Sequence, residues 1–271
     1  MYWKEAIEGN FHRVVKETKL GLVSDMDGTL SPIVNDPDEA QVTDRNRHLL
    51  RELQDILSLL AVISGRAPCD VQKRVGLEGV IYIGNHGLER CIRGQIIPHQ
   101  DLEKYRPLLK SAKDRLEPQL GPGTQLEDKG ATLSIHFRRT NNPRKEEMQL
   151  SPKIQEIANE FQLRFTHGRM VFELRPPLKV DKGSALKQIV VEQNLKAVIY
   201  LGDDTTDVAA MRMCRTLRKE RVCDAWGIGV LSPGMPERLE NYADFFVDGV
   251  SEVEEFLDWL LMSRKASSTW L

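Results

Sequence analysis

The chain has 271 residues, of which 38 are basic and 40 acidic, so its net charge at neutral pH is only −2. This balance argues against nucleic acid or an anionic membrane as the main partner. Hydrophobic residues make up 41% of the chain, enough to pack one large domain or two modest ones. No apolar run approaches the roughly 20 residues that cross a bilayer, so we expect no membrane partner.

The cysteines and the N-terminal residues indicate the cellular compartment of the protein. The four cysteines form no C-x-x-C pair and no His cluster accompanies them, so neither a zinc site nor a disulfide framework is expected. Residues 1–19 are charged and mixed, without the apolar segment of a signal peptide. We therefore expect reduced thiols and a cytoplasmic protein.

In the first third of the chain, short apolar runs alternate with helical patterns. The expected elements are a helix over residues 3–18, strands over 20–25, 61–63 and 80–83, a helix over 43–60 that Thr43 caps, and a further helix before the last strand. Alternation of strand, loop, helix and strand is typical of a parallel sheet with helices on both faces.

The pattern changes after Gly87. Strands are expected over residues 124–129, 131–139 and 169–175, and helices over 104–117 and 151–161, the second capped by Ser151 with Pro152 in its first turn. Strands that follow strands, with the helices apart, indicate an antiparallel sheet covered on one face. Residues 88–177 are therefore expected to form an inserted α+β domain.

The alternating pattern resumes near Val180. The expected elements are a helix over residues 182–193, a strand over 197–201, a helix from about 205–207, strands over 228–231 and 245–247, and a last helix that Ser251 and Glu254 cap. Residues 1–87 and 178–271 should therefore form one α/β core that the inserted domain interrupts.

Polar side chains stand at four corresponding positions of this core. Asp25 and Asp27, Ser64, and Asp203 with Asp207 follow strands, and Lys182 precedes a helix. Each alone fits a surface turn, a helix cap or a solvated lysine. Because the carboxyl ends of parallel strands meet at one edge of the sheet, their common placement indicates one shared site.

The residue types at these positions indicate a particular chemistry. Four carboxylates in one crevice repel one another unless a cation lies among them. Oxygen ligands without His or Cys favour Mg²⁺, which often bridges to phosphate. Ser64 and Lys182 would then hold phosphate oxygens, and an aspartate can accept a phosphoryl group covalently. The set predicts phosphoryl transfer.

The motifs resemble those of known families. The Asp-x-Asp-Gly-Thr-Leu stretch, Ser64, Lys182 and Gly-Asp-Asp-x-x-Asp resemble the four motifs of the haloacid dehalogenase (HAD) superfamily. Asp-Gly-Thr-Leu-Ser-Pro-Ile, Ile-Ser-Gly-Arg, Gly-Asn-His-Gly, Phe-Glu-Leu-Arg-Pro, Asp-Lys-Gly and Gly-Asp-Asp-Thr-Thr-Asp resemble the trehalose-6-phosphate phosphatase family, over about residues 20 to 250.

The resemblance implies both a fold and an activity. The fold would be a HAD-like Rossmannoid parallel-sheet core with an inserted α+β cap of the C2 type, which sets substrate specificity. The activity would be Mg²⁺-dependent hydrolysis of trehalose 6-phosphate to trehalose and phosphate through an aspartyl-phosphate, a step of trehalose biosynthesis and carbohydrate metabolism. A trehalose-6-phosphate synthase of the same pathway would be a partner.

The resemblance also assigns roles to the core residues. Asp25 resembles the nucleophile and a Mg²⁺ ligand, and Asp27 resembles the general acid/base that also offers the metal its backbone carbonyl. Ser64 and Lys182 would hold the phosphoryl group, and Asp203 would bind the metal, with Asp207 beside it directly or through water. Two positions depart from the family pattern, Val208 in place of Glu and Ser24 within the apolar run before the nucleophile.

The inserted domain carries alternating polar residues, which on a strand share one face. Hydroxyl-rich sugars suit such hydrogen-bonding faces, although a half-solvated sheet produces the same alternation. The resemblance places six of them at or near the sugar: Glu127, Lys129, His136, Arg138, Glu173 and Arg175. Arg66 and His86 would contribute from the core, and His86 could instead serve the glycine-flanked turn that contains it.

Three rival functions remain. A related phosphatase could act on sucrose 6-phosphate or mannosyl-3-phosphoglycerate with the same core. A non-catalytic sugar-phosphate-binding regulator should have lost the nucleophile or the lysine, whereas Asp25, Asp27 and Lys182 are all present. A nucleotide-binding reductase is disfavoured because no G-x-G-x-x-G follows the first strand.

Overall fold

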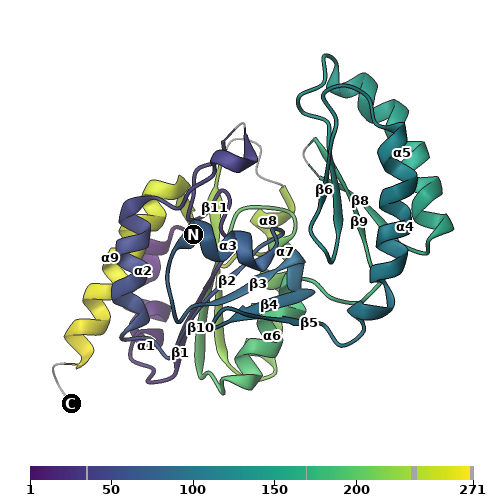
Figure 1. Ribbon diagram of the computed structural model, residues 1–271. Coiled ribbons are helices and arrows are strands. Elements are labelled where there is room, and N and C mark those ends of the chain that lie inside the picture. Colours follow the sequence, from purple (N-terminus) through teal and green to yellow (C-terminus); the bar gives the residue numbers. More distant parts are fainter. Residues whose placement is uncertain (35, 169, 233–236, 269–271) are drawn as a thin grey trace. The chain divides into compact units, whose positions relative to one another are not determined.

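The computed structural model describes residues 1–34, 36–168, 170–232 and 237–268 and divides into two compact units (Figure 1). The first unit comprises Met1–Ile97 and Val180–Leu271, and the second comprises Pro98–Lys179. Each unit has its own sheet and its own buried apolar cluster. No helix in the described ranges is both long enough and apolar enough to span a membrane.

The first unit is organised around an eight-stranded sheet of order β12-β11-β10-β1-β2-β3-β4-β5. Its strands are β1 (Leu20–Ser24), β2 (Leu59–Ile63), β3 (Ile81–Gly84), β4 (Glu89–Ile92), β5 (Gln95–Pro98), β10 (Ala197–Gly202), β11 (Asp224–Leu231) and β12 (Phe245–Asp248). The strands from β12 to β3 pair in parallel, and β4 runs antiparallel to β3. Every residue of β1 and β10 is buried, as expected for central strands covered on both faces.

Helices cover both faces of this sheet (Figure 1). They are η1 (Trp3–Ala6), η2 (Ile7–Phe11), α1 (His12–Val14), η3 (Pro37–Glu39), α2 (Asp44–Gln54), α3 (Pro68–Val75), η4 (Asn85–Gly87), α6 (Lys182–Glu192), α7 (Asp207–Lys219), α8 (Glu237–Tyr242) and α9 (Gly249–Ser268). The apolar residues of α2, α3 and α9 share one buried cluster, and those of α6, α7 and α8 share the other. The predicted α/β core is thereby confirmed.

The N-terminal segment differs from the single helix expected over residues 3–18. It forms a 3₁₀ turn, a short π-helix and one α turn, namely η1, η2 and α1. The aromatic residues Trp3 and Phe11 are buried, with ring centroids 5.3 and 5.6 Å from that of Phe256 on α9. Tyr2 forms a parallel bridge with Phe246, so this segment packs against the β12 side of the core.

The second unit is a four-stranded antiparallel sheet of order β6-β7-β9-β8 with helices on one face. Its elements are η5 (Leu102–Lys104), α4 (Arg106–Leu116), η6 (Glu117–Gln119), β6 (Gln125–Asp128), β7 (Leu133–His136), α5 (Pro143–Glu160), β8 (Arg164–Gly168) and β9 (Val171–Arg175). Alternate residues such as Ile135 and Phe172 pack with Ile154 of α5, which leaves the other sheet face polar.

The boundary of the inserted segment lies ten residues later than the expected position after Gly87. Residues 89–92 and 95–98 form β4 and β5, which continue the sheet of the first unit. The return to the first unit falls at Val180 instead of residue 178. The hairpin of β4 and β5 was missed because its second strand is largely exposed and its aliphatic residues are limited to Ile96 and Ile97.

Several element ends also differ from expectation. Helix α5 begins at Pro143, which Asn142 caps, so Ser151 is not a cap and Pro152 lies inside the helix. Helix α9 begins at Gly249, and Glu254 accepts a hydrogen bond from Thr43 instead of closing a capping box with Ser251. Other ends shift modestly: α2 stops at Gln54, β2 begins at Leu59, and β11 already begins at Asp224. Arg169, the first residue of an expected strand, lies outside the described residues.

Candidate active site

The site begins at the turn that ends β1. The backbone N–H of Asp25 donates to the carbonyl of Leu201 on β10 (2.8 Å), which continues the sheet pairing by one residue. The Asp25 side chain is buried at the carboxyl end of the central strand. Ser24, a departure from the family pattern, donates its hydroxyl to the Asp25 carbonyl (2.7 Å) and so is satisfied within the core.

Lys182 lies against the Asp25 carboxylate. Its ammonium Nζ is 2.9 Å from Asp25 Oδ1 and 2.8 Å from Asp207 Oδ1, and the side chain is almost wholly buried. Lys182 is the first residue of α6, whose start is fixed by a reciprocal capping box between Asp181 and Ser184. This capping box at the start of α6 therefore fixes the position from which the Lys182 side chain extends into the site.

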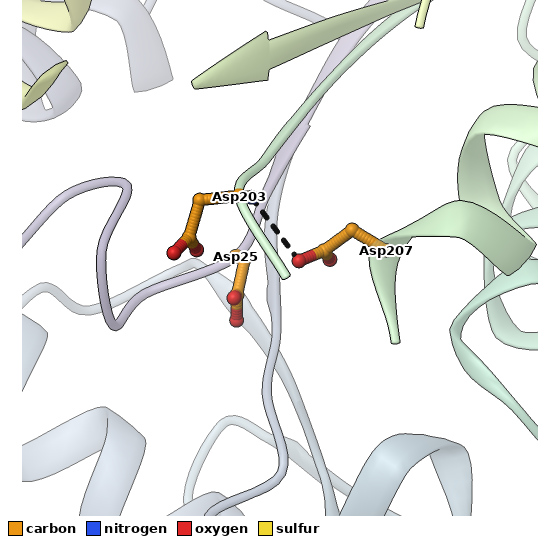
Figure 2. Close-up of side chains that lie close together, drawn as sticks. All are labelled: Asp25, Asp203 and Asp207. Carbon is orange, nitrogen blue, oxygen red and sulfur yellow. Dashed lines mark hydrogen bonds between the residues drawn. The ribbon is translucent and has the colours of Figure 1, made fainter. Parts of the chain in front are cut away.

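The turn after β10 brings two further carboxylates to the same place (Figure 2). Asp203 follows β10 and Asp207 is the first residue of α7. Each of these residues, Asp25, Asp203 and Asp207, has a carboxylate oxygen within 4.8 Å of one oxygen of each of the other two. The dashed line in Figure 2 is the hydrogen bond from the Asp203 backbone N–H to Asp207.

Burial and neighbouring charges shift the pKa values of the residues in this acidic cluster. Desolvation, opposed by Lys182 and reinforced by Asp207, raises the pKa of Asp25 well above its usual value. Burial and the Asp207 charge also raise the pKa of Asp203 to about 8. Burial alone would lower the pKa of Lys182, but the neighbouring Asp207 and Asp25 charges outweigh it and raise that pKa. Lys182 therefore stays charged. The pKa values of Asp25 and Asp203 remain raised even beside it, so a further cation would stabilise their ionised forms.

This set of residues fits the predicted Mg²⁺. Asp25, Asp203 and Asp207 offer carboxylate oxygens, and the predicted Asp27 carbonyl is also an oxygen, the type of donor that Mg²⁺ prefers. A divalent cation would stabilise the ionised forms of Asp25 and Asp203, whose pKa values are raised by burial and, to a smaller extent, by neighbouring carboxylates. Asp25 and Asp203 are the residues best placed to hold it, because the oxygens of Asp207 already accept other hydrogen bonds.

Ser64 lies at the end of β2, the strand next to β1. Its side chain is buried, its N–H donates to the Ile83 carbonyl (2.9 Å), and its Oγ accepts from the Arg66 N–H (3.2 Å). The structure therefore places Ser64 at the same edge of the sheet as Asp25. Its contact with a phosphoryl group stays a prediction.

Arg66, which was predicted to contact the sugar, forms an ion pair with Asp27. The guanidinium donates from Nε to Asp27 Oδ2 (2.7 Å) and from Nη2 to Oδ1 (2.9 Å), which is a bidentate ion pair. A third donation reaches Asp70 (3.1 Å), which also accepts from Arg74 (2.8 Å). Arg66 thus orients the predicted acid/base in this structure, and its contact with substrate stays a prediction.

His86 belongs to the turn after β3. Its backbone has a left-handed φ of 57°, and its N–H donates to the Ser64 carbonyl (3.0 Å). The imidazole lies so close to Gly65 that a Cβ added there would be 2.7 Å from the ring. These contacts support the turn role considered from the sequence, while a role at the sugar stays a prediction.

The remaining predicted residues lie together on the second unit. His136 Nε2 is 3.0 Å from Glu127, and Lys129 Nζ is 3.8 Å from both Glu127 and Glu173. Arg175 Nε is 3.9 Å from Glu173. Arg138 lies two residues beyond the end of β7 and is half-buried. We call these six residues the polar face: Glu127, Lys129, His136, Arg138, Glu173 and Arg175.

Sequence reasoning missed two residues that touch the acidic site. Tyr200 of β10 donates its hydroxyl to Asp207 Oδ1 (2.5 Å), and Thr29 donates its hydroxyl to Asp203 Oδ1 (3.3 Å). Burial, with the Asp207 charge, raises the pKa of Tyr200 well above its usual value. The available signal for Tyr200 was a polar-tipped residue in an otherwise aliphatic strand that ends at the acidic turn.

The parallel sheet with an inserted α+β unit is a fold of the haloacid dehalogenase-like class. A haloacid dehalogenase-like hydrolase from Bacteroides thetaiotaomicron superposes with a TM-score of 0.64, covering 90% of this chain and all of that chain at 16% identity. Residues 23–241 match the family model for trehalose-phosphatase. The chain belongs to the trehalose-phosphatase family.

Two further likenesses agree with this membership. The chain is 32% identical over 274 residues to a probable trehalose-phosphate phosphatase 4 of Oryza sativa subsp. japonica, covering 93% of this chain and 69% of the relative. A crystal structure titled as a trehalose-6-phosphate phosphatase related protein superposes with a TM-score of 0.75 and 25% identity, covering 89% of this chain and 97% of that one.

Proposed function

We propose that the protein is a Mg²⁺-dependent phosphatase that hydrolyses trehalose 6-phosphate to trehalose and phosphate. The observation that carries the proposal is the buried Asp25 carboxylate with Lys182 Nζ at 2.9 Å and Asp203 and Asp207 close by. Membership of the trehalose-phosphatase family supports the choice of substrate. Because the acidic group is buried, a bound phosphoryl group would meet these charges in a low dielectric, where they act strongly.

In the first half-reaction, Asp25 attacks phosphorus and the bond between phosphorus and the sugar oxygen breaks. Asp27, in its protonated form, gives its proton to that oxygen, so trehalose leaves as an alcohol. Lys182, held against Asp25, offsets the negative charge on the phosphoryl oxygens as it transfers. Ser64 holds one of these oxygens from the neighbouring strand.

In the second half-reaction, Asp27 acts as a base. It takes a proton from a water molecule whose oxygen attacks the phosphorus of the aspartyl-phosphate, and the bond to Asp25 breaks to release inorganic phosphate. Arg66 keeps the Asp27 carboxylate in a fixed orientation through its two hydrogen bonds. When bound by Asp25 and Asp203, Mg²⁺ supplies charge stabilisation for the transferring group.

We propose that the polar face of the second unit recognises the sugar. A disaccharide offers many hydroxyls, and a buried polar partner left unpaired costs about 1–3 kcal/mol, which allows such a face to discriminate. The mutual contacts among Glu127, Lys129 and Glu173 support this assignment because they pre-orient charged groups on one side of the sheet. Arg66 and His86 of the first unit would complete recognition.

Two further expectations belong to this proposal. A trehalose-6-phosphate synthase would supply the substrate as a pathway partner, and the protein would act in the cytoplasm. Family membership supports the first, and four cysteines without a disulfide support the second. Cell fractionation that locates both this protein and the synthase tests them. Recovery of this protein only in a secreted or organellar fraction would contradict the location, and a synthase confined to another compartment would contradict its role as supplier.

The deciding experiment measures phosphate release from trehalose 6-phosphate, sucrose 6-phosphate and mannosyl-3-phosphoglycerate, each with Mg²⁺ and with EDTA. We expect trehalose 6-phosphate to be preferred and EDTA to abolish turnover. Preference for either other substrate would establish the rival phosphatase. Binding of trehalose 6-phosphate without phosphate release would establish the regulator instead.

The variant Asp25→Asn tests the nucleophile. The amide cannot attack phosphorus, so we expect at least about a thousandfold loss of kcat. The fold should survive, because the substitution removes one charge from a crowded acidic group, and circular dichroism with thermal unfolding checks this point. A folded variant with near-wild-type kcat would show that another residue attacks.

A further inference from the structure

The Asp207 carboxylate accepts four hydrogen bonds. Lys182 Nζ (2.8 Å) and the Tyr200 hydroxyl (2.5 Å) both donate to Oδ1. The backbone N–H groups of Asp203 (3.2 Å) and Asp204 (2.9 Å) both donate to Oδ2. A carboxylate has about four lone-pair sites, so these donors occupy both oxygens and fix the side chain in one orientation.

Tyr200 is a buried polar residue that the proposed reaction does not use. It lies opposite Val23 in the pairing of β10 with β1, and its ring packs in the cluster under α6 and α7. The side chain has no exposed surface. A hydroxyl buried in this way is costly unless it makes a hydrogen bond, and the bond to Asp207 provides one.

We infer that Tyr200 is a positioning residue for phosphoryl transfer, because it holds the same Asp207 oxygen that holds Lys182. The inference rests on the proposed function. The ammonium of Lys182 bridges Asp25 and Asp207 at the end of a flexible four-carbon chain. Its place beside Asp25 therefore depends on where Asp207 Oδ1 is held. Without the tyrosine hydroxyl, that oxygen can turn and draw the ammonium away from Asp25.

The same geometry gives Asp207 the role of an anchor and not of a direct metal ligand. A direct bond from Asp207 to a cation would require one of its four donors to leave. Asp25 and Asp203 would hold the metal in this arrangement, and Tyr200 would act on the bound phosphoryl group through Lys182. Removal of the Tyr200 hydroxyl should therefore weaken the binding of phosphate much more than the binding of Mg²⁺.

The test compares Tyr200→Phe with Tyr82→Phe. Tyr82 is also buried and also donates one short hydrogen bond, to the Leu77 carbonyl (2.7 Å), but it packs on the opposite face of the sheet. Each variant thus loses one buried hydroxyl, and only Tyr200→Phe loses a contact with Asp207. Kinetics use trehalose 6-phosphate or p-nitrophenyl phosphate, and calorimetry measures the binding of Mg²⁺ and of inorganic phosphate.

We expect Tyr200→Phe to lower kcat on the order of tenfold and to lower the affinity for inorganic phosphate several-fold. Its Mg²⁺ affinity should stay within about twofold of wild type. Tyr82→Phe should match wild type in all three. Equal phosphate affinity in both variants, or a Mg²⁺ affinity lowered as much as kcat, would overturn the inference. If wild type hydrolyses no phosphomonoester, the proposed function fails, while the phosphate and Mg²⁺ titrations still decide the role of Tyr200.

Discussion

Gly28 has two separate reasons to be glycine. Its φ of +82° lies in the left-handed region, where a side chain costs about 1–2 kcal/mol. A Cβ added there would also lie 2.1 Å from Asp203 Oδ2. The turn that follows the predicted nucleophile therefore comes into direct contact with a predicted metal ligand, and the two acidic loops are shaped to fit each other.

Gly28→Ala and Gly94→Ala form a matched pair for this contact. Gly94 also has a left-handed φ, of +76°, but a Cβ there meets nothing within 4 Å. Both variants should lose about 1–2 kcal/mol of stability from backbone strain, and Gly28→Ala should in addition lose most of its turnover and Mg²⁺ affinity. Urea unfolding and phosphate release measure these quantities. Full activity in Gly28→Ala would mean that Asp203 can move aside freely.

The sequence was sufficient to predict which residues gather at the sheet edge, since alternation of strands and helices places Asp25, Ser64 and Asp203 at equivalent strand ends. It was not sufficient to predict which side chains pair. The bidentate contact of Arg66 with Asp27 and the four donors on Asp207 depend on rotamers and on strand pairing. Spacing along the chain carries no information about either.

The N-terminal segment shows how little regular structure an element needs in order to pack well. Its backbone passes through three short helical forms, yet Phe11 is completely buried, with ring centroids 4.8 Å from Phe245 and 5.7 Å from Trp259. Aromatic pairs at such distances contribute beyond the area that they bury. The segment is therefore expected to stabilise the core without taking part in catalysis.

Phe11→Ala should lower the free energy of unfolding by about 3–5 kcal/mol, because it leaves a cavity among aromatic rings. The control is Met262→Ala on α9, where the side chain is 63% exposed and the expected change is within about 0.5 kcal/mol. Both should keep wild-type kcat at temperatures where they are folded. A loss of less than 1 kcal/mol for Phe11→Ala would show that this segment is only loosely attached.

Helix α5 shows why boundaries were harder to predict than the elements themselves. Both Asn142-Pro143 and Ser151-Pro152 carry the signal of a capping residue followed by proline, and only the first pair starts the helix. Buried Leu150 and Ile154 lie on either side of Pro152, so tertiary packing holds the helix together across it. Local signals alone could not rank the two starts.

The chain crosses between its two units twice, near Ile97 and near Lys179. The acidic site lies entirely within the first unit, and the polar face lies entirely within the second. Chemistry and sugar recognition are thus proposed to belong to separately packed parts. Changes in the second unit should therefore alter the choice of substrate while leaving the phosphoryl-transfer groups intact.

Glu173→Ala tests this division, with Glu156→Ala as its control. Glu173 contacts Lys129 and Arg175 on the polar face, whereas Glu156 is exposed on α5. For Glu173→Ala we expect kcat/KM to fall on the order of ten- to a hundredfold with trehalose 6-phosphate and to change little with p-nitrophenyl phosphate. The control should match wild type on both. Equal losses on the two substrates would contradict a role in sugar recognition.

The strand order of the first unit also has a consequence for how the protein is made. The central strand β1 pairs on one side with β2, about 40 residues later, and on the other with β10, about 175 residues later. During synthesis one edge of β1 therefore waits for most of the chain to leave the ribosome, while the second unit can already fold from local contacts. Lys182, Asp203 and Asp207 all arrive in this late portion, so a prematurely terminated chain carries Asp25 but no assembled site. Completion of the sheet and onset of activity should coincide.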